Sequence, residues 1–282
     1  MRPSPPLPHP GVPRGCAWGG DLGRLDELVV LEDNHLLALF KPGGVLAQAD
    51  RSQDVCLLGA LKEHLIRKYS KPGDAFVGLV HRLDRPSSGV MLFGKTSKGS
   101  ARLCEAFRER KVLKKYLVVV EGVIERDEQL QDYLLMHKSP NETLVSPVAS
   151  SDTVEGILSY RVLRNLNGSS LSLLDVSLTT GRKHQIRSQL AHRGHPVVGD
   201  LKYGSKRKFV NRYIALHAYL MSFHHPVSHK QIILTCPPPL CWTETFGESP
   251  ESDFNKAVDD FCNGHNKGSF EAHHFLRRAK TK

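Results

Sequence analysis

Hydrophobic and polar residues alternate along the chain in ways that predict individual helices and strands. Two short apolar runs in residues 25–44 flank the polar pair Asp33-Asn34 and predict a hairpin that ends at Pro42-Gly43-Gly44. In residues 56–69, leucine and isoleucine recur at spacings of three and four, which predicts an amphipathic helix. The same spacing in residues 97–111 predicts a second helix.

Strands dominate the rest of the pattern. Apolar runs predict strands at residues 89–95, 116–122, 153–164, 169–179, 214–223 and 231–237. Both faces of the 169–179 strand carry leucine or valine beside polar residues, so we expect only partial burial of its two faces. Residues 182–194 predict a short helix closed by Gly194. Because strands outnumber helices and come in runs, we predict the α+β class, with a mixed, mostly antiparallel central sheet and flanking helices.

The pattern also divides the chain into three segments. Residues 1–25 are rich in proline, and the apolar periodicity is lost after about residue 247. We therefore expect an N-terminal extension over 1–25, a folded body over 26–246 and a mobile C-terminal tail over 247–282. No apolar stretch approaches the roughly 20 residues of a bilayer span, so we expect no membrane partner, and we expect a monomer.

The chain is basic. Its 282 residues contain 39 Lys and Arg against 29 Asp and Glu, a formal net charge of +10. Most of this excess lies in the body, so the phosphate backbone of a nucleic acid is the first partner to consider. A solvated, lysine-rich surface explains the charge alone equally well.

Six cysteines are scattered over the sequence without the spacing of a disulfide framework or a zinc site. Cys236 and Cys241 form the closest pair, and three of the four residues between them are prolines. We therefore expect reduced thiols, no metal and an intracellular protein. The cytoplasm, the nucleus and an organelle such as the mitochondrion all stay open as its compartment.

Residues 89–96 formally match the phosphate-binding pattern G-x-x-x-x-G-K-[ST]. A phosphate-binding loop needs a strand before its first glycine and a flexible segment between the two glycines. Here the four spacer residues are bulky and apolar, and the preceding stretch is polar and contains Pro86. The segment therefore predicts a buried strand, and nucleotide hydrolysis is kept only as a minor alternative.

Just before that strand, Asp84 lies among His81, Arg82 and Arg85 on a segment bounded by Pro86. Proline and the following glycine predict an irregular loop, where functional residues often lie. A carboxylate among cations suits a nucleophile or a charge stabiliser better than a general acid. The alternative is that Asp84 caps a turn and pairs with Arg85 on the surface.

A second polar cluster spans residues 179–187. If residues 182–193 are helical, His184 and Arg187 form one row and Gln185 and Gln189 another, both suited to phosphates at the positive end of the helix. The alternative is a basic amphipathic helix on the surface.

These two clusters belong to a longer series of motifs. His81-Arg82-Leu83-Asp84 with Ser87-Ser88-Gly89 resembles the H-R-L-D-x-x-[TS]-S-G signature of the RluA-type RNA pseudouridine synthases. Other segments resemble further motifs of that family in the same order: Lys41-Pro42-Gly43-Gly44, Lys115-Tyr116, Gly181–Arg187, Gly194–Asp200 with Tyr203-Gly204, Leu216-His217-Ala218 and His225-Pro226. The resemblance covers about residues 26–246, and its departures are mild, such as Ser87 where threonine is commoner.

The resemblance implies a catalytic domain over residues 26–246 that isomerises uridine in RNA without a cofactor. The C1′–N1 bond is cut, the base turns, and C5 is joined to C1′. Asp84 matches the family's essential aspartate, Tyr116 the tyrosine that packs on the base, and Arg187 the arginine that pairs with the aspartate. Arg82 matches a residue that helps to expel the uridine. The other side chains expected to bind substrate, several of them through phosphates, are Lys41, His81, Arg182, Lys183 and His184.

The expected reaction suits these residue types. Breaking a glycosidic bond develops positive charge on the sugar, which a carboxylate can stabilise or trap. The base must leave its stack, so we expect a structured RNA with an accessible uridine as the partner. Whether tRNA, rRNA or mRNA is processed stays open. The main alternative from another class is an RNA-binding protein that has the fold and lacks catalysis.

Overall fold

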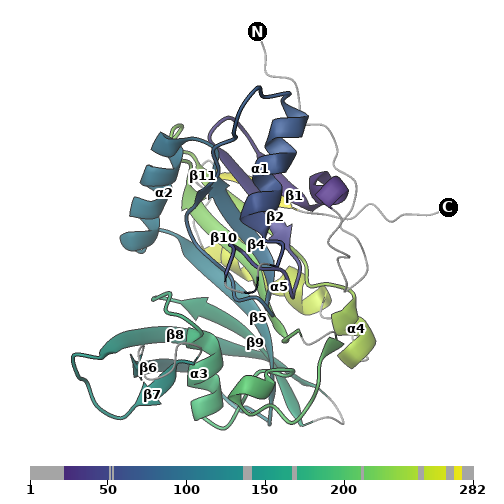
Figure 1. Ribbon diagram of the computed structural model, residues 1–282. Coiled ribbons are helices and arrows are strands. Elements are labelled where there is room, and N and C mark those ends of the chain that lie inside the picture. The colour runs from purple at the N-terminus through teal and green to yellow at the C-terminus, as the bar shows by residue number, and fades with distance from the viewer. Residues whose placement is uncertain are drawn as a thin grey trace, which may run out of the picture.

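The computed structural model describes residues 22–50, 52, 54–135, 142–166, 170–210, 213–246, 251–264 and 270–274 (Figure 1). Its strands are β1 (Val29–Glu32), β2 (Leu36–Lys41), β3 (Gly78–Leu79), β4 (Ser88–Gly94), β5 (Leu113–Glu121), β6 (Glu128–Leu135), β7 (Leu144–Ser146), β8 (Thr153–Leu166), β9 (Leu171–Leu178), β10 (Leu216–His224), β11 (Gln231–Thr235) and β12 (Phe270–His274). Its helices are α1 (Leu57–Lys68), α2 (Ser97–Arg108), α3 (Gln185–His192), α4 (Cys241–Phe246) and α5 (Glu251–Gly264), with short 3-10 helices η1 (Leu22–Leu28) and η2 (Leu201–Tyr203).

The described strands form one mixed sheet. Its main path runs β1-β2-β4-β10-β5-β9-β8-β6-β7, with β3 beside β4 and with β11 joining β10 to β12. The β4–β10 and β11–β12 pairs are parallel, and the other pairs are antiparallel. The predicted α+β class with a mostly antiparallel sheet is therefore confirmed.

Strand β10 is the centre of the sheet, because it has different neighbours along its length. Near its start it pairs with β4, through Ala218 and Gly89, and further along it pairs with β11. On its other side it pairs with β5, where Ala218 lies opposite Tyr116. Gly89, Ala218 and Tyr116 are therefore neighbours across three strands, and the loop before β4 is brought beside β5.

Gly89 makes this arrangement possible. Its φ is +132°, and an added Cβ atom would come within 2.4 Å of the Ala218 carbonyl oxygen. Only glycine adopts this conformation freely and lets the two main chains approach so closely. A side chain at position 89 would push β4 away from β10.

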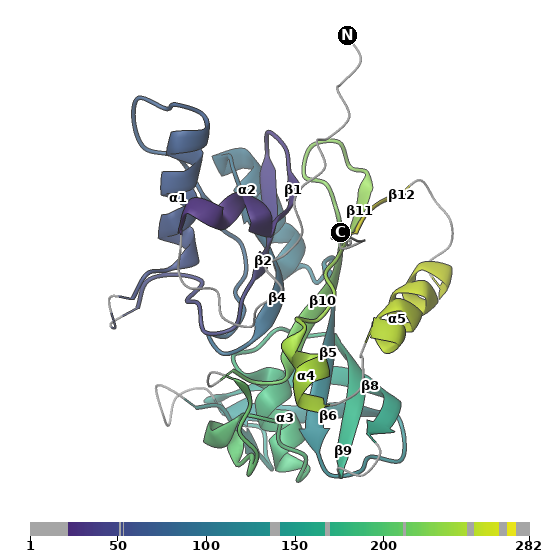
Figure 2. The same ribbon diagram turned by 90° about the vertical axis from the view of Figure 1, so that its right-hand side faces the viewer.

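The helices pack on separate parts of the sheet. Helices α1 and α2 both lie at the β1–β2–β4 end of the sheet, whereas α3 lies beside β6 and β7 at the other end (Figure 1). The view in Figure 2 shows β5 and β10 running between these two parts. Strand β2 and strand β4 are buried at every position, as expected of strands covered on both faces. Among the described residues, no helix combines the length and apolar character of a bilayer-spanning segment.

The segment that matches a phosphate-binding pattern is a strand and a helix cap. Residues 88–94 form the buried strand β4, as predicted. Lys95 donates to Glu32 Oε1 at 2.7 Å and to the Asp33 carbonyl oxygen at 2.7 Å. The Thr96 hydroxyl accepts from the Gly99 N–H at 3.1 Å and caps α2. The residues of the pattern are thus used inside the fold, which removes the support for nucleotide hydrolysis.

Most predicted elements are present, with a few differences near the start and middle of the chain, among them the short strand β3, which was not predicted. Residues 22–28 form a 3-10 helix before the hairpin of β1 and β2. Strands β6 and β7 have no counterpart in the prediction, because alternating polar residues and short length give them a weak apolar signal. Strand β9 is buried at six consecutive positions from Leu171 to Val176, so its burial exceeds the partial burial that we expected.

Within the segment predicted as a mobile tail, residues 251–264 form helix α5 and residues 270–274 form strand β12. Ala257 and Phe261 of α5 are buried. Asp260 pairs with Arg161 of β8 at 3.2 Å, and β12 pairs with β11. The partners of α5 are distant in sequence, so local periodicity could not show the contact. The domain boundaries stay predictions, and residues 1–21 lie outside the described part.

The cysteines differ in state. Cys56, Cys104 and Cys236 are free thiols, whereas Cys241 is part of a disulfide. The expectation of reduced thiols is therefore wrong for Cys241. Spacing in the sequence says little about pairing between cysteines that the fold brings together.

The buried side chain of His217 should make the free energy of unfolding depend on pH. It is fully buried in β10, where the Cys236 carbonyl oxygen lies 2.9 Å from Nε2 and the Ser88 hydroxyl lies 2.9 Å from Nδ1. Since a carbonyl only accepts, Nε2 carries a proton. Burial lowers the pKa of His217 from 6.5 to about 4, against the effect of the Cys236 carbonyl. On acidification the unfolded chain therefore takes up this proton first, so stability falls between pH 6.5 and 4.

We expect this single group to contribute a slope of about 1.4 kcal/mol per pH unit over that range. Urea unfolding at pH 7, 6 and 5 measures it. The variant His217→Asn, which cannot titrate there, should show a smaller slope than the wild type. An identical slope in both proteins would contradict the assignment.

Candidate active site

The loop between β3 and β4 presents Asp84, and its own main chain closes it into a turn. The Ser87 N–H and hydroxyl both donate to the Asp84 carbonyl oxygen, at 3.1 Å and 2.9 Å. The Gly44 N–H donates to the Arg85 carbonyl oxygen at 2.7 Å, which ties the loop to the end of the first hairpin. These hydrogen bonds give partners to main-chain groups of a loop that pairs with no strand. They hold the main chain from which the Asp84 side chain projects.

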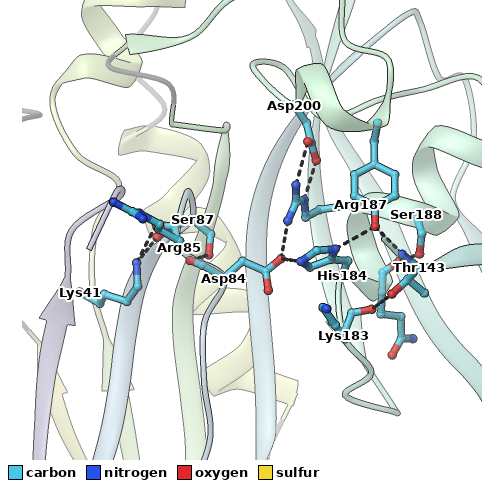
Figure 3. Close-up of polar contacts among 12 residues, drawn as sticks. Lys41, Asp84, Arg85, Ser87, Thr143, Lys183, His184, Arg187, Ser188 and Asp200 are labelled. Carbon is cyan, nitrogen blue, oxygen red and sulfur yellow. Dashed lines mark hydrogen bonds and ion pairs between the residues drawn. The ribbon is translucent and has the colours of Figure 1, made fainter. Parts of the chain in front are cut away.

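Arg187 joins Asp84 to a second carboxylate. Its Nη1 donates to Asp84 Oδ2 at 3.0 Å, while Nε and Nη2 donate to the two oxygens of Asp200 at 2.6 Å and 2.9 Å. Figure 3 shows the guanidinium between the two acids. The bidentate pair with Asp200 fixes the plane of the guanidinium, so its remaining N–H is directed at Asp84.

Arg187 is buried yet charged. Burial disfavours its charge, but the hydrogen bonds to Asp200 and the charge of Asp84 outweigh this effect and raise the pKa of Arg187 above its ordinary value. The Tyr203 ring packs against the guanidinium, 4.9 Å from its carbon. Asp84 itself keeps about a quarter of its side-chain surface exposed, so one face of the carboxylate stays open.

Tyr116 lies on β5 and forms part of the same site. Its side chain is largely buried, and burial raises the pKa of its hydroxyl, with the negative charge of Asp84 adding to the shift. The phenol is therefore neutral at physiological pH. The register of β4, β10 and β5 places it beside the Asp84 loop.

A cavity of about 500 Å³ opens between these residues, a volume typical of ligand sites. Its walls come from the loop before β4, from the end of α2 with β5, and from the segment between β9 and α3. The basic side chains that line it are Arg82, Arg108, Arg110, Lys114, Arg182, Lys183 and Arg187. Among the described residues that line it, Asp84 is the sole carboxylate. The cavity therefore attracts an anion and offers it one reactive carboxylate.

The structure brings together all but one of the predicted site residues. Asp84, Tyr116, Arg187, Arg82, His81, Arg182, Lys183 and His184 all line the cavity. Arg82, Arg182 and Lys183 are exposed, and the Arg182 Nε donates to the Glu155 carbonyl oxygen at 3.1 Å.

His81 is a neutral member of the site. Its Nε2 accepts from the Leu92 N–H at 2.9 Å, and its ring stacks on Phe107 at 4.8 Å. Burial, with a smaller effect of Lys114, lowers the pKa of His81 to about 3. Since Nε2 accepts, Nδ1 carries the proton, and that edge is the one left to donate to a ligand.

Lys41 anchors the Asp84 loop and does not line the cavity. Its side chain is fully buried, and Nζ donates to the carbonyl oxygens of Pro42 (2.9 Å), Arg85 (3.2 Å) and Ser87 (2.7 Å) (Figure 3). Burial lowers the pKa of Lys41 to about 7, although the charge of Asp84 opposes this. The three acceptors match the three N–H donors of an ammonium group. The expected substrate contact of Lys41 is therefore corrected to a contact with the protein's own main chain.

We expect Lys41→Met to lower the free energy of unfolding by about 2–4 kcal/mol, because it leaves the loop carbonyls without a donor. Urea unfolding measures this loss. Lys62→Met is the matched control, since Lys62 is only half-buried and its partner Asp74 is exposed, and it should change stability by less than about 1 kcal/mol. Equal stability of the two variants would contradict the anchoring role.

Helix α3 begins later than predicted. It starts at Gln185, so Arg182 and Lys183 lie on the preceding loop, and His184 occupies the N-cap with φ +51°. This left-handed residue turns the chain, so that Gln185, Arg187 and Gln189 face the interior rather than a surface. A regular 3.6-residue repeat cannot show such a turn.

Two residues of the site had no predicted role. Asp200 and Tyr203 lie in a motif whose resemblance the sequence shows, but nothing in the sequence pairs them with Arg187. Asp200 follows Arg187 by thirteen residues, and this spacing indicates an ion pair only if the intervening chain is known to bring the two side chains together. Arg108, Arg110 and Lys114 were also missed, because they follow no motif.

Comparisons with known proteins agree with the resemblance that the motifs show. Residues 35–192 match the model of the RNA pseudouridylate synthase family. The chain is 32% identical over 217 residues to the ribosomal large subunit pseudouridine synthase D of Zymomonas mobilis, covering 72% of this chain and 67% of that protein. It is 31% identical over 207 residues to the dual-specificity RNA pseudouridine synthase RluA of Vibrio vulnificus, covering 71% of this chain and 79% of the relative.

Solved structures share the fold. Human RNA pseudouridylate synthase domain containing 4 aligns with a TM-score of 0.64 at 21% identity, covering 77% of this chain and 91% of that one. Human RNA pseudouridylate synthase domain containing 1 aligns with a TM-score of 0.59 at 23% identity, covering 76% and 84%. With the family model matching more than half of its length, this chain belongs to the RNA pseudouridylate synthase family.

Proposed function

We propose that Asp84 is the essential carboxylate with which this RNA pseudouridine synthase isomerises uridine to pseudouridine in RNA. The observation that carries the proposal is the 3.0 Å contact between Asp84 and Arg187 in the wall of a cavity whose other lining charges are positive. The positive lining attracts the phosphate backbone. The carboxylate is then the group that meets the sugar.

In this reaction the C1′–N1 bond of one uridine breaks while Asp84 stabilises or traps the positive charge that develops at C1′. The uracil turns until C5 faces C1′, and the C1′–C5 bond forms. The proton on C5 leaves and N1 takes up a proton, so the composition of the RNA is unchanged. Arg187 keeps its charge in the buried wall and holds the carboxylate in place throughout these steps.

Tyr116 is proposed to hold the uracil while it turns. An aromatic ring offers a flat apolar face that supports a base without fixing the direction of its edge. Its hydroxyl stays neutral because burial raises its pKa, so it does not repel Asp84. A cavity of about 500 Å³ has room for one nucleotide.

The substrate is proposed to be a structured RNA whose target uridine is unpaired or weakly paired. Placing a base in a cavity of this kind requires its extrusion, which costs a few kcal/mol and costs least where pairing is already weak. We propose that Arg82, exposed on the loop beside Asp84, helps to expel the base. Arg182 and Lys183 are proposed to hold flanking phosphates, and His81 and His184 to face the nucleotide.

We also propose that the chain acts as a monomer. In support of this proposal, the residues to which we assign a role all belong to one cavity of a single chain.

Release of tritium from RNA labelled at C5 of uridine tests the function directly, because C5 loses its hydrogen only when the new carbon–carbon bond forms. We expect catalytic release with structured RNA as substrate. An RNA-binding protein without catalysis would bind the labelled RNA and release no tritium above background. If folded protein bound several classes of labelled RNA and released no tritium from any of them, the proposal would be rejected.

A further inference from the structure

Both side chains that approach Asp84 do so at the same oxygen. Arg187 Nη1 donates to Oδ2 at 3.0 Å, and His184 Nε2 lies 3.9 Å from that same atom. Figure 3 shows the Arg187 and His184 contacts meeting at one end of the carboxylate. The two oxygens of Asp84 are thus in different surroundings, and Oδ1 is the one left for a ligand in the cavity.

The second nitrogen of His184 is held by Tyr203. The Tyr203 hydroxyl lies 2.8 Å from His184 Nδ1, and the same hydroxyl oxygen accepts the Thr143 N–H at 2.9 Å. Because the Thr143 bond uses the oxygen as an acceptor, the hydroxyl proton is free to be donated to Nδ1. Nδ1 then accepts, so the proton of the neutral ring is on Nε2, the nitrogen that faces Asp84.

Several features fix the ring in this orientation. His184 is at the N-cap of α3 with a left-handed main chain, which directs the side chain away from the helix toward the loop of Asp84. Its ring packs edge-on against Tyr203 at 5.7 Å. The Tyr203 ring in turn packs on Arg187, so one tyrosine contacts both side chains that face Oδ2.

We propose that Tyr203 and His184 are positioning residues that direct a neutral N–H at Oδ2 of Asp84, so that Oδ1 is the oxygen that meets C1′. This inference rests on the proposed function of Asp84. The 3.9 Å separation is too long for a hydrogen bond and is expected to shorten when the nucleotide fills the cavity, as is common for catalytic contacts.

A neutral donor is better suited to this task than a cation. Burial lowers the pKa of His184 to about 4, with the charge of Asp84 opposing and those of Arg187, Lys183 and Lys202 assisting. The ring therefore orients the carboxylate without adding a second positive charge, which would weaken the attraction of Asp84 for a developing cation on the sugar.

Three variants test the pair by tritium release, with kcat and KM determined separately. His184→Asn suits a left-handed main chain and has no atom at the place of Nε2, so we expect kcat to fall about tenfold, with a smaller change in KM. His184→Gln restores an N–H at about that distance and should recover part of the loss. Tyr203→Phe keeps the ring on Arg187, removes the hydroxyl, and should lower kcat about three- to tenfold.

The double variant gives the sharpest result. If the two residues act in one path, adding Tyr203→Phe to His184→Asn should cost no further activity. His192→Asn, on the exposed end of α3, is the control and should match the wild type. Wild-type kcat in His184→Asn, equal losses in the Asn and Gln variants, or full additivity in the double variant would each overturn the inference. Asp84→Asn in the same series separates this outcome from a failure of the proposed function, which would appear as retained turnover in that variant.

Discussion

Asp84→Asn should lower turnover at least about a thousandfold and leave RNA affinity at or slightly above the wild-type value. The substitution keeps the shape of the side chain and removes its negative charge, so the sugar cation loses its stabilising group. Affinity is preserved because phosphates are attracted by the basic lining, from which one repulsive charge has been removed. Tritium release measures the first effect, and filter binding with the same RNA measures the second.

The matched control is Asp74→Asn. Asp74 has 73% of its side-chain surface exposed and pairs with Lys62 on the surface, so its amide variant should turn over at the wild-type rate. Turnover within tenfold of the wild type in Asp84→Asn would reject the carboxylate role. A parallel loss of RNA affinity would indicate misfolding of the loop instead, which thermal unfolding of the same sample would reveal.

Asp200→Asn should cost both stability and activity. The substitution replaces one of the two Asp200 oxygens that accept from Arg187 with an NH₂ group, which faces a donor of the guanidinium. It also leaves the buried guanidinium with Asp84 as its remaining acidic partner. Breaking a buried ion pair from one side costs about 3–5 kcal/mol. We also expect turnover to fall about tenfold to a hundredfold, because Arg187 loses the partner that fixes its plane.

An exposed aspartate–arginine pair provides the control for this second variant. Asp54 contacts Arg85 at 2.7 Å with about half of each side chain exposed, so Asp54→Asn should change the free energy of unfolding by less than about 1 kcal/mol. Urea unfolding of the two variants gives the comparison. If Asp200→Asn were as stable and as active as Asp54→Asn, the bidentate pair would have no role in the site.

The sequence predicted the parts of the molecule whose signal is local. Helices α1 and α2 and the strands β4, β5 and β9 follow from apolar spacing alone, although β9 is more buried than its spacing predicts. The motifs around Asp84 and Arg187 predicted the family, the isomerase class and RNA as the substrate, all supported by the comparisons. The structure then brings Asp84 and Arg187, 103 positions apart in the sequence, to 3.0 Å.

What the sequence could not predict depends on contacts between distant segments. Lys41 was expected to contact the substrate because it is a basic residue in a motif of the resemblance. Its burial and its bonds to three carbonyl oxygens show a contact with the protein's own main chain instead. The role of Asp200 can be recognised only from the fold, in which the start of η2 lies against Arg187. The docking of α5 depends on Arg161 and Arg164 of β8, which carry no mark in the sequence that distinguishes them from other surface arginines.

The alignment of Gly89, Ala218 and Tyr116 across three strands has a practical consequence for engineering. It fixes Tyr116 and the start of β4, from which the Asp84 loop leads, in the frame of the sheet, whereas Arg110, Arg182 and Lys183 come from other loops around the cavity. The rim can therefore be exchanged for that of another enzyme by loop grafting while the reacting groups keep their spacing. Reprogramming of the target RNA should start from those loops and leave position 89 untouched.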